Sequence, residues 1–259
     1  MELHFLGTGG GRYVTGMQKR KTGGIIIKTD ETQIHVDPGP GALVNSHEML
    51  ENSEETEAVL VSHAHMDHFN DAQAIIEMMV EAYNNAGILL ANRTVLEGFG
   101  DIEKSISDHH QGLCGRIDTM KEGSTHEVED LTIECQEMFH SDPRTVGFTF
   151  ENDKKKIGFW TDTEYSDELV DFYSDCDTLV IYCSRPKDAP TNSHTAVDEV
   201  PDIVEASEAD TVILTHFGYK LLDEGVEEQK EWLEEEIDQK VILAEDGIKF
   251  PGNRTLDAF

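Results

Sequence analysis

Four residues of metal-binding type stand within six positions of the chain: His63, His65, Asp67 and His68. They follow the apolar run 58–62, which predicts a buried strand that ends at the cluster. In extended backbone His63 and His65 point to the same side, because side chains alternate along a strand. An apolar periodic segment then predicts a helix over 68–84, whose first turn directs Asp67 and His68 at a second point. Imidazole and carboxylate together suit Zn²⁺, Mn²⁺ or iron, so this segment predicts ligands for two adjacent metal ions.

Further residues of the same types follow other predicted strands. The strands are expected at 33–36, 131–138, 156–160, 178–183 and 211–215, and the residues that come after them are Asp37, His140, Asp162, His194 and His216. A single histidine after a strand is more often structural than a ligand. Several such residues downstream of a metal-binding cluster reverse that expectation, and the sequence therefore predicts that they join the cluster.

The elements that must position these residues change in kind along the chain. Strands with tight turns come first, at 3–6, 24–28 and 33–36, and strands alternate with helices in the second half. Helices are expected at 166–173, 195–208 and 226–239, and a last strand at 240–243. Hairpins followed by such alternation predict an α/β fold of two packed sheets with helices on the outer faces. The length suits a single domain over 1–259, with 97–127 interpreted as a lid-like excursion of ambiguous structure.

Composition excludes several classes of protein. The 53 acidic and 20 basic residues give a formal charge of −33, which opposes a long polyanion and is typical of proteins from a salt-rich cytoplasm. Neither an apolar run of membrane-spanning length nor an export signal is present. The four cysteines form no C-x-x-C pair and are expected to be reduced and mostly buried. We therefore expect a soluble cytoplasmic protein without a membrane partner, and the sequence leaves a homodimer open.

The ordered set of metal-binding residues resembles the metallo-β-lactamase superfamily over nearly the whole chain. The resemblance implies an αββα sandwich with the metal site at one edge of the two sheets. Within the superfamily, the segments 192–196 (Asn-Ser-His-Thr-Ala) and 212–217 (Val-Ile-Leu-Thr-His-Phe) are similar to the branch that holds tRNase Z and small phosphodiesterases.

The resemblance also implies a role for each residue. The first metal would be held by His63, His65 and His140, and the second by Asp67, His68 and His216, with Asp162 bridging the two. Asp37 would hydrogen-bond a ligand histidine and fix its tautomer. Two divalent ions, Zn²⁺ or Mn²⁺, suit hydrolysis of a phosphodiester. Asp67 and His194 are the candidate catalytic residues, His194 as general acid or donor to a phosphate oxygen. The structural alternative for His194 is a loop histidine that caps a helix.

The substrate is indicated by what the chain lacks. His140 and Asp162 are 22 positions apart, which leaves no room for the long tRNA-gripping arm that tRNA endonucleases of this branch carry there. The short interval and the run 184–190 are more similar to the cyclic ribose-phosphate phosphodiesterase of the carbon–phosphorus lyase pathway. Because residues 8–24 contain no cysteine, we do not expect the third, structural zinc of that relative. The leading hypothesis is a hydrolase of a small or cyclic phosphodiester, and the alternative is an RNA-processing endonuclease. A redox enzyme with a single iron is disfavoured by the complete second ligand set.

Basic residues near the N-terminus are conspicuous in so acidic a chain. Arg12 and Arg185 are candidate substrate-binding residues, and the run 19–21 (Lys-Arg-Lys) is either a solvated loop or a local anion site. The glycine-rich run 7–11 follows a strand, but 13–22 shows no helical pattern, so a dinucleotide-binding fingerprint is disfavoured. We expect instead a glycine-rich loop packed under the metal site.

Overall fold

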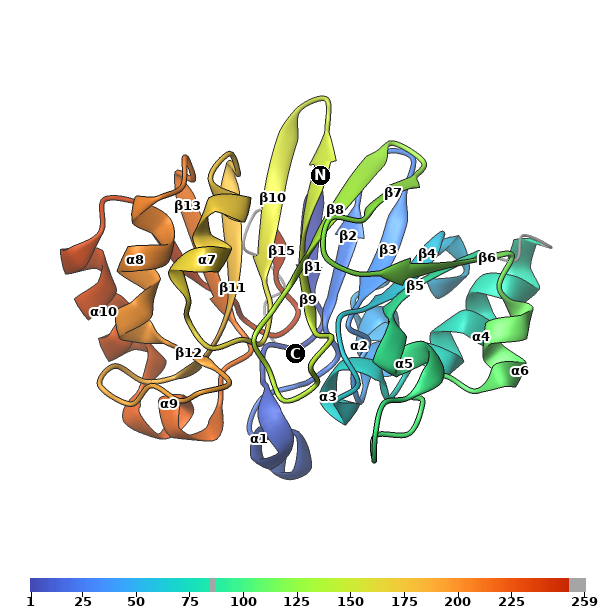
Figure 1. Cartoon of the computed structure of the whole chain (residues 1–259), viewed down its shortest axis with the longest axis horizontal. Coiled ribbons are helices and arrows are strands. Elements are labelled where there is room, and N and C mark those ends of the chain that lie inside the picture. The colour runs from blue at the N-terminus through green and yellow to red at the C-terminus, as the bar shows by residue number, and fades with distance from the viewer. Residues whose placement is uncertain (84–86, 252–259) are drawn as a thin grey trace.

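The computed structural model describes residues 1–83 and 87–251, and in it two β-sheets pack face to face between outer layers of helices (Figure 1). The predicted αββα sandwich is confirmed. Residue 84 of the helix expected over 68–84, and residues 252–259 of the domain expected over 1–259, lie outside the described residues.

The first sheet has the strand order β15-β1-β2-β3-β4-β5-β6. Its neighbours pair antiparallel from β15 to β3 and parallel from β3 to β6. The strands are β1 (Glu2–Phe5), β2 (Ile25–Lys28), β3 (Gln33–Val36), β4 (Ala58–Val61), β5 (Ile88–Asn92), β6 (Arg116–Met120) and β15 (Lys249–Phe250).

The second sheet has the order β14-β13-β11-β10-β9-β8-β7, and β12 pairs with β11 beside it. Its pairs are antiparallel from β7 to β10 and parallel from β10 to β14. The strands are β7 (Thr125–Val128), β8 (Leu131–Glu137), β9 (Val146–Asn152), β10 (Lys155–Trp160), β11 (Thr178–Arg185), β12 (Thr195–Ala196), β13 (Thr211–Thr215) and β14 (Lys240–Leu243).

The space between the sheets is filled by alternate residues of both. Ile25, Ile27, Ile34 and Val36 contribute from the first sheet, and residues of β8 to β11 contribute from the second. Three phenylalanines pack ring against ring there, with centroids 5.3–5.5 Å apart: Phe148, Phe150 and Phe159. Full burial of each such side chain stabilises the fold by roughly 1.5–3 kcal/mol, so the core fixes how the two sheets face each other.

Helices cover the outer faces of both sheets. The α-helices are α1 (Gly11–Met17), α2 (Ala42–Glu48), α3 (Met66–Phe69), α4 (Ala72–Tyr83), α5 (Arg93–Glu97), α6 (Asp108–Leu113), α7 (Asp167–Val170), α8 (Val200–Glu205), α9 (Tyr219–Glu224) and α10 (Val226–Glu236). Short 3₁₀ turns are η1 (Ser53–Glu55), η2 (Asp171–Tyr173) and η3 (Val197–Glu199). Apolar residues of α4 and α5 pack on β4 and β5, whereas α7 to α10 pack on the second sheet.

Residues 97–127 do not form a lid, and that interpretation was wrong. The segment contains α6 and then β6 and β7, which are the last strands of the first and second sheets. It therefore carries the chain from one sheet to the other. These strands could not be predicted from the sequence because both lie at sheet edges. Only Met120 of β6 and Val128 of β7 are buried, so neither strand shows an alternation of apolar and polar residues.

Three helices also differ from their prediction. Residues 11–17 form α1, although only Val14 and Thr15 of that helix are buried, which leaves too little apolar periodicity to detect. The helix expected over 68–84 is divided into α3 and α4 at Asp71, whose amide donates to the carbonyl of Pro38. The helix expected over 195–208 is shorter, because the Thr195 hydroxyl accepts from the Trp160 indole at 2.9 Å and holds 195–196 as β12.

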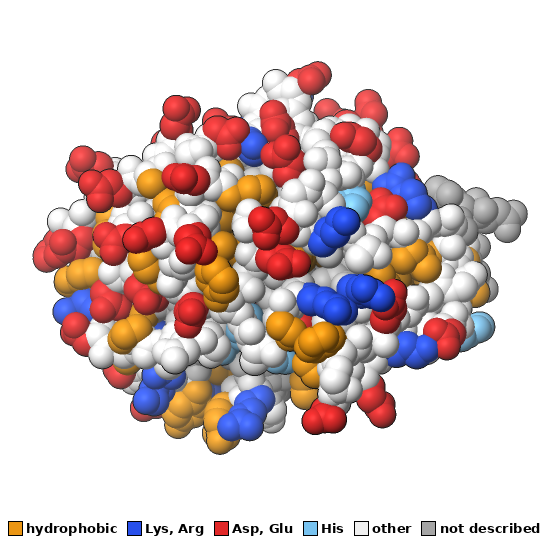
Figure 2. All heavy atoms as spheres, in the orientation of Figure 1, with side chains coloured by type: hydrophobic (Ala, Val, Ile, Leu, Met, Phe, Trp, Pro, Cys, Tyr) orange, Lys and Arg blue, Asp and Glu red, His pale blue; other side chains and the backbone are white. Residues whose placement is uncertain are grey.

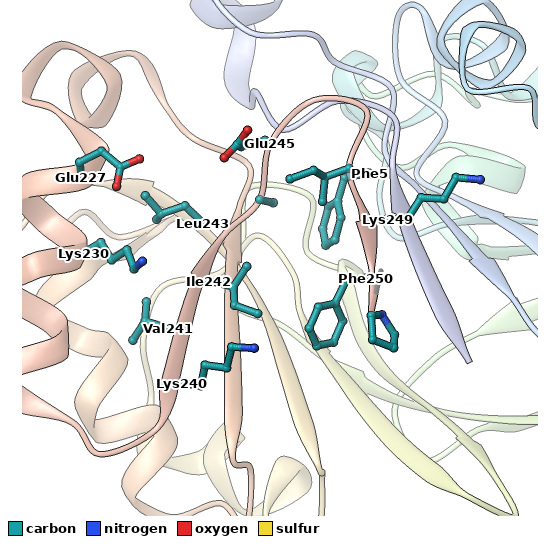
Figure 3. A pocket seen from close by; sticks show the side chains of 13 residues that line it. Phe5, Glu227, Lys230, Lys240, Val241, Ile242, Leu243, Glu245, Lys249 and Phe250 are labelled. Carbon is teal, nitrogen blue, oxygen red and sulfur yellow. The ribbon is translucent and has the colours of Figure 1, made fainter. Parts of the chain in front are cut away.

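A cavity of about 430 Å³ opens between β14 and β15, where the last strands of the two sheets part (Figure 3). Apolar side chains such as Phe5, Ile242 and Phe250 line it together with Lys230 and Lys240. None of the predicted metal-binding residues lines this cavity.

Two expectations from composition can be compared with the structure. Three of the four cysteines are buried, Cys114 is half-buried, and all four are free thiols, as expected. Within the described ranges, none of the helices has the length and apolar character needed to cross a membrane.

Candidate metal centre

The predicted metal-binding residues meet at one edge of the sandwich because the strands that precede them end there. β4, β8, β10 and β13 all run toward this edge, which is the lower edge in Figure 1 beside α1 and α3. The ligand-type atoms form two groups, each within 4.8 Å. One group is His63, His65, His140 and Asp162, and the other is Asp67, His68 and His216.

In the first group three imidazole nitrogens converge. His65 Nδ1 lies 3.0 Å from His63 Nε2 and 3.1 Å from His140 Nε2. Zinc–nitrogen bonds of 2.0–2.1 Å in a tetrahedral site place ligand nitrogens about 3.3 Å apart. The three nitrogens therefore have nearly the spacing that a zinc-sized ion requires.

The second group has a similar arrangement. His68 Nε2 lies 3.1 Å from His216 Nε2, and the Asp67 Oδ2 oxygen lies 3.7 Å from the first nitrogen and 3.5 Å from the second. Asp162 lies between the groups, with Oδ2 at 3.7 Å from His63 Nε2 and 3.3 Å from His68 Nε2. One carboxylate thus contacts both groups, as the bridging role predicted for Asp162 requires.

Hydrogen bonds on the far side of the rings orient two of the histidines. His68 Nδ1 donates to Asp37 Oδ2 at 2.9 Å, as expected for Asp37. Ser62 donates its amide and its hydroxyl to the same carboxylate, at 2.7 and 2.8 Å, and its oxygen accepts from His63 Nδ1 at 2.9 Å. Because these contacts hold the Nδ1 side of both rings, Nε2 is the nitrogen that each ring turns toward the centre.

The other two rings of the first group are oriented differently. His140 Nδ1 donates to the carbonyl of Ser193 at 2.8 Å, which directs its Nε2 inward. His65 is turned the opposite way, since its Nε2 lies 3.1 Å from the Ser141 hydroxyl and its Nδ1 faces the centre. The local geometry thus selects the ring nitrogen that each histidine offers.

Burial and charge prepare the centre for a cation. Burial lowers the pKa of His140 to about 4, so this ring is neutral near pH 7 and its lone pair is available to a metal ion. Burial alone would also lower the pKa of His68, but Asp67 and Asp37 raise it well above the usual range. The negative field that favours a proton on His68 equally favours a metal ion at the same place. The donor set and its field therefore fit divalent metal ions.

His194 lies beside both groups. Its Nδ1 is 3.5 Å from Asp162 Oδ1, and its ring centroid is 5.1 Å from that of His140. Burial would lower the pKa of His194, but the Asp162 carboxylate raises it. About a quarter of the side chain (27%) remains exposed. His194 precedes β12 rather than a helix, so the helix-capping alternative does not apply.

The glycine-rich loop packs against the metal centre, as expected. The amide of Gly11 donates to Asp67 Oδ2 at 2.6 Å. A Cβ atom at Gly10 would lie 2.2 Å from His216 Nδ1, so no larger residue fits without moving that ring. Gly39 is equally confined, because its Cβ would lie 1.9 Å from the carbonyl oxygen of Asp67.

Two residues of the centre have left-handed backbone, which is unfavourable for residues other than glycine. Asp37 has φ 50° and His216 has φ 59°. Each such conformation costs about 1–3 kcal/mol and persists only where the surrounding structure imposes it. Such strain is typical of functional sites.

The basic residues do not gather into one surface. Arg12 lies over the Tyr13 ring at 5.0 Å, one residue from the amide that binds Asp67. Arg185 donates to the carbonyl of Ala189 at 3.0 Å. Within the run 19–21, Arg20 donates to the Thr8 hydroxyl and to the Ala244 carbonyl. The two lysines beside it have other partners. Lys19 lies over the Tyr219 ring, and Lys21 forms an ion pair with Glu48.

The sequence did not reveal two buried residues of the centre. Tyr182 donates to Asp37 Oδ2 at 3.3 Å, and its ring stacks on His216 with centroids 5.1 Å apart. Its place on β11 resembles that of any core residue, so no local signal marks it. Asp142 accepts one hydrogen bond from the segment that holds His63 and His65, and its only signal in the sequence is its position two residues after His140.

Comparison with known proteins agrees with this geometry. The family model described as the beta-lactamase superfamily domain matches residues 32–217. The chain belongs to this family. The metallo-β-lactamase superfamily expected from the sequence is thereby confirmed. An uncharacterized protein of Methanocaldococcus jannaschii, MJ1374, is 32% identical over 252 residues, which span 96% of this chain and 94% of that protein.

Solved structures of the superfamily share the fold. The metallo-β-lactamase fold protein YhfI from Bacillus subtilis has a TM-score of 0.78 at 17% identity, covering 96% of this chain and 98% of its own. A diphosphatase from the PhnP family has a TM-score of 0.71 at 16% identity, covering 96% of each chain. The short form of human tRNase Z (ELAC1) has a TM-score of 0.69 at 16% identity, covering 96% of this chain and 98% of its own. At these sequence identities the likeness shows that the chain shares its fold with these proteins.

Proposed function

We propose that this superfamily member is a dinuclear metal-dependent phosphodiesterase that hydrolyses a small or cyclic phosphodiester. The observation that carries the proposal is the place of Asp162, whose Oδ2 contacts ligand-type nitrogens of both groups. A single-metal hydrolase needs no second group of Asp67, His68 and His216. Support also comes from the structural likeness to a protein named as a diphosphatase.

Each residue has a definite part in this reaction. His63, His65 and His140 would hold one ion, and Asp67, His68 and His216 the other, with Asp162 shared. When bound, two such ions lower the pKa of a water toward ~7 and stabilise both the attacking and leaving oxygens of an in-line displacement. The oxygen of a water forms a bond to phosphorus and gives up a proton, the bond from phosphorus to one ester oxygen breaks, and that oxygen takes up a proton. An acyclic diester yields a phosphomonoester and an alcohol, and a cyclic diester yields a single phosphomonoester that carries the new hydroxyl.

His194 is suited to supply the proton that the leaving oxygen needs. Its carboxylate neighbour, Asp162, raises its pKa, which favours the protonated form of the ring. The partial exposure of its side chain allows contact with a substrate. Asp162 Oδ1 lies 3.5 Å from Nδ1 of this ring, which leaves Nε2 as the nitrogen available to a bound phosphodiester.

A small substrate is favoured by the structure of the interval between His140 and Asp162. The hairpin of β9 and β10 occupies it, so no arm projects from this part of the chain. Acidic side chains are numerous on the face over α7, α8 and α10, whereas the basic side chains are scattered over this view and form no single patch (Figure 2). The net charge of −33 opposes a long polyanion, whereas a small diester brings only one or two charges.

An RNA-processing endonuclease remains the second candidate, favoured by one observation. Beside the centre, Arg12 lies over Tyr13, the rings of Tyr13 and Tyr219 are 6.4 Å apart, and Lys19 lies 4.0 Å from the centroid of Tyr219. Exposed aromatic rings combined with cations are typical of single-stranded nucleic-acid contacts. The structural likeness to human tRNase Z agrees with this candidate.

The two candidates are separated by kinetics of the protein loaded with Zn²⁺ or Mn²⁺. Bis(p-nitrophenyl) phosphate tests for phosphodiesterase activity, and a panel of cyclic phosphates, a dinucleotide and a 3′-extended tRNA tests substrate size. We expect kcat/KM to be higher for the small diesters at every ionic strength, with salt narrowing the difference because it screens the repulsion of tRNA. Site-specific tRNA cleavage by the isolated protein at low salt would favour the endonuclease, and no diester hydrolysis at all would reject both.

A further inference from the structure

Asp142 is a buried carboxylate in the turn between β8 and β9, with its side chain closed off from solvent. Its two oxygens accept four hydrogen bonds. Oδ2 accepts from the Ala64 amide at 3.1 Å and from Asn92 Nδ2 at 3.0 Å. Oδ1 accepts from the Thr94 hydroxyl at 2.7 Å and from the Arg144 amide at 3.1 Å. All four donors are neutral groups, so burial of this charge is compensated by hydrogen bonds rather than by a cation.

These donors come from three separate parts of the fold. Ala64 lies between the ligand residues His63 and His65, in the loop that follows β4 of the first sheet. Asn92 and Thr94 stand where β5 meets α5, and the Asn92 side chain also caps that helix by accepting from Val95 at 2.8 Å. The Arg144 amide lies, like Asp142 itself, in the turn between β8 and β9 of the second sheet, and Asp142 follows His140 by two residues. One carboxylate therefore joins the His63–His65 loop to the strand end that carries His140.

A carboxylate is needed for this set of contacts. An ionised Asp offers about four lone-pair positions and no donor, and here each oxygen faces two donors. An Asn of the same shape would direct its amide protons at two of them and leave buried donors unsatisfied. A second hydrogen bond joins the same two parts of the fold. The Val146 amide donates to the carbonyl of Ser62, the residue just before the His63–His65 loop, at 3.2 Å.

We propose that Asp142 is a positioning residue for the first metal ion. By holding the Ala64 amide, it fixes the loop between His63 and His65 relative to His140, so that the three ring nitrogens meet at one point. Among the described interactions, no hydrogen bond or ion pair joins Asp142 to the second group, which is Asp67, His68 and His216. The proposal rests on the metal centre of the proposed function, but not on any particular substrate.

The test is metal binding by Asp142→Asn, measured by competition between the protein and a chromophoric chelator for Zn²⁺. His65→Ala and His216→Ala identify which binding step belongs to which group. We expect Asp142→Asn to weaken, by about 10–100-fold, the zinc-binding step that is lost in His65→Ala. Loss of a residue that orients metal ligands has an effect of this size on metal affinity. The step that His216→Ala removes should keep its wild-type affinity. Equal weakening of both steps, or lower thermal stability with both affinities unchanged, would show that Asp142 is only structural.

Two matched variants serve as controls. Thr94→Val removes one hydroxyl from Asp142 but leaves the Ala64 contact, so it should lower stability and spare zinc affinity. Asp130→Asn changes an aspartate that accepts from two threonine hydroxyls at the opposite end of β8, and it should spare both metals. Loss of the first-metal step in either control would contradict the proposed role of the Ala64 contact.

A further measurement decides the case if Asp142→Asn does not fold. In the wild-type protein without metal, hydrogen exchange at the Ala64 amide should be slow, because that amide is held by Asp142. Exchange at the rate of a free loop would overturn the proposal. Wild-type protein that binds two zinc ions yet hydrolyses no phosphodiester would reject the proposed function and leave the role of Asp142 intact.

Discussion

The Nδ1 nitrogen of His194 lies 3.5 Å from the Oδ1 oxygen of Asp162, the carboxylate that contacts both groups of candidate ligands. This pair connects the residue suited to proton transfer with the residue suited to bridge two metals. A change at His194 should therefore affect proton transfer alone, whereas a change at Asp162 should affect metal binding.

His194→Ala should keep both metals but lower kcat by roughly 10²–10⁴-fold on a diester with an alkoxide leaving group. The loss should be smaller with p-nitrophenolate, which leaves without protonation. Steady-state kinetics on the two classes of substrate, with metal content measured in parallel, checks this. Equal losses on both classes would indicate that His194 binds substrate and does not act as an acid.

Asp162→Ala should lose metal as well as activity, because its carboxylate contacts both groups. We expect wild-type protein purified without chelator to approach two transition-metal ions per chain, and His216→Ala to retain about one. Elemental analysis after equilibration with Zn²⁺ or Mn²⁺ measures the stoichiometry. A wild-type protein that stays at one equivalent in excess metal would contradict the dinuclear proposal.

Gly10→Ala should impair the second metal group, because the added Cβ would lie 2.2 Å from His216 Nδ1 and displace that ring. Gly16→Ala is the matched control, since a Cβ at Gly16 meets no atom within 4 Å. Zinc titration should show weaker binding of one equivalent in the first variant only. Wild-type affinity in Gly10→Ala would mean that the loop moves aside freely.

His35 should make the stability of the metal-free protein depend on pH. Its ring is fully buried on the outer face of the first sheet, and neither nitrogen has a hydrogen-bond partner among the described residues. Burial lowers the pKa of His35 from 6.5 to about 4, against a smaller opposing effect of Glu51. Because the unfolded chain then binds more protons between pH 4 and 6.5, the free energy of unfolding should fall as the pH decreases through that range. A shift of this size corresponds to about 3 kcal/mol.

Chemical unfolding with chelator present, at a series of pH values, measures this effect. His35→Leu should lack that part of the pH dependence, whereas His47→Gln, a change at an exposed histidine, should keep it. If the unfolding free energy of His35→Leu changed with pH as steeply as that of the wild type, the acid sensitivity would belong to other groups.

The sequence by itself was enough to predict which side chains of metal-binding type gather at one edge of the fold. Apolar runs such as 58–62 mark buried strands through local periodicity, and His63, His65, Asp162 and His216 follow strand ends directly. Carboxyl ends of the strands that precede them share one edge of a sandwich, so residue type and position along the chain were enough to predict the gathering of these side chains. Two packed sheets with outer helices followed from the order of hairpins and of strand–helix alternation, and the αββα class followed from the resemblance to the superfamily.

Only the tertiary structure decided the contacts that orient those residues. Asp142 and the Ala64 amide are 78 positions apart, and the Tyr182 hydroxyl reaches Asp37 across 145, so no local pattern relates them. The edge strands β6 and β7 and the short helix α1 bury too few side chains to leave a periodic signal. Their conformations depend on hydrogen bonds and packing with distant segments, which exist only once the two sheets have come together.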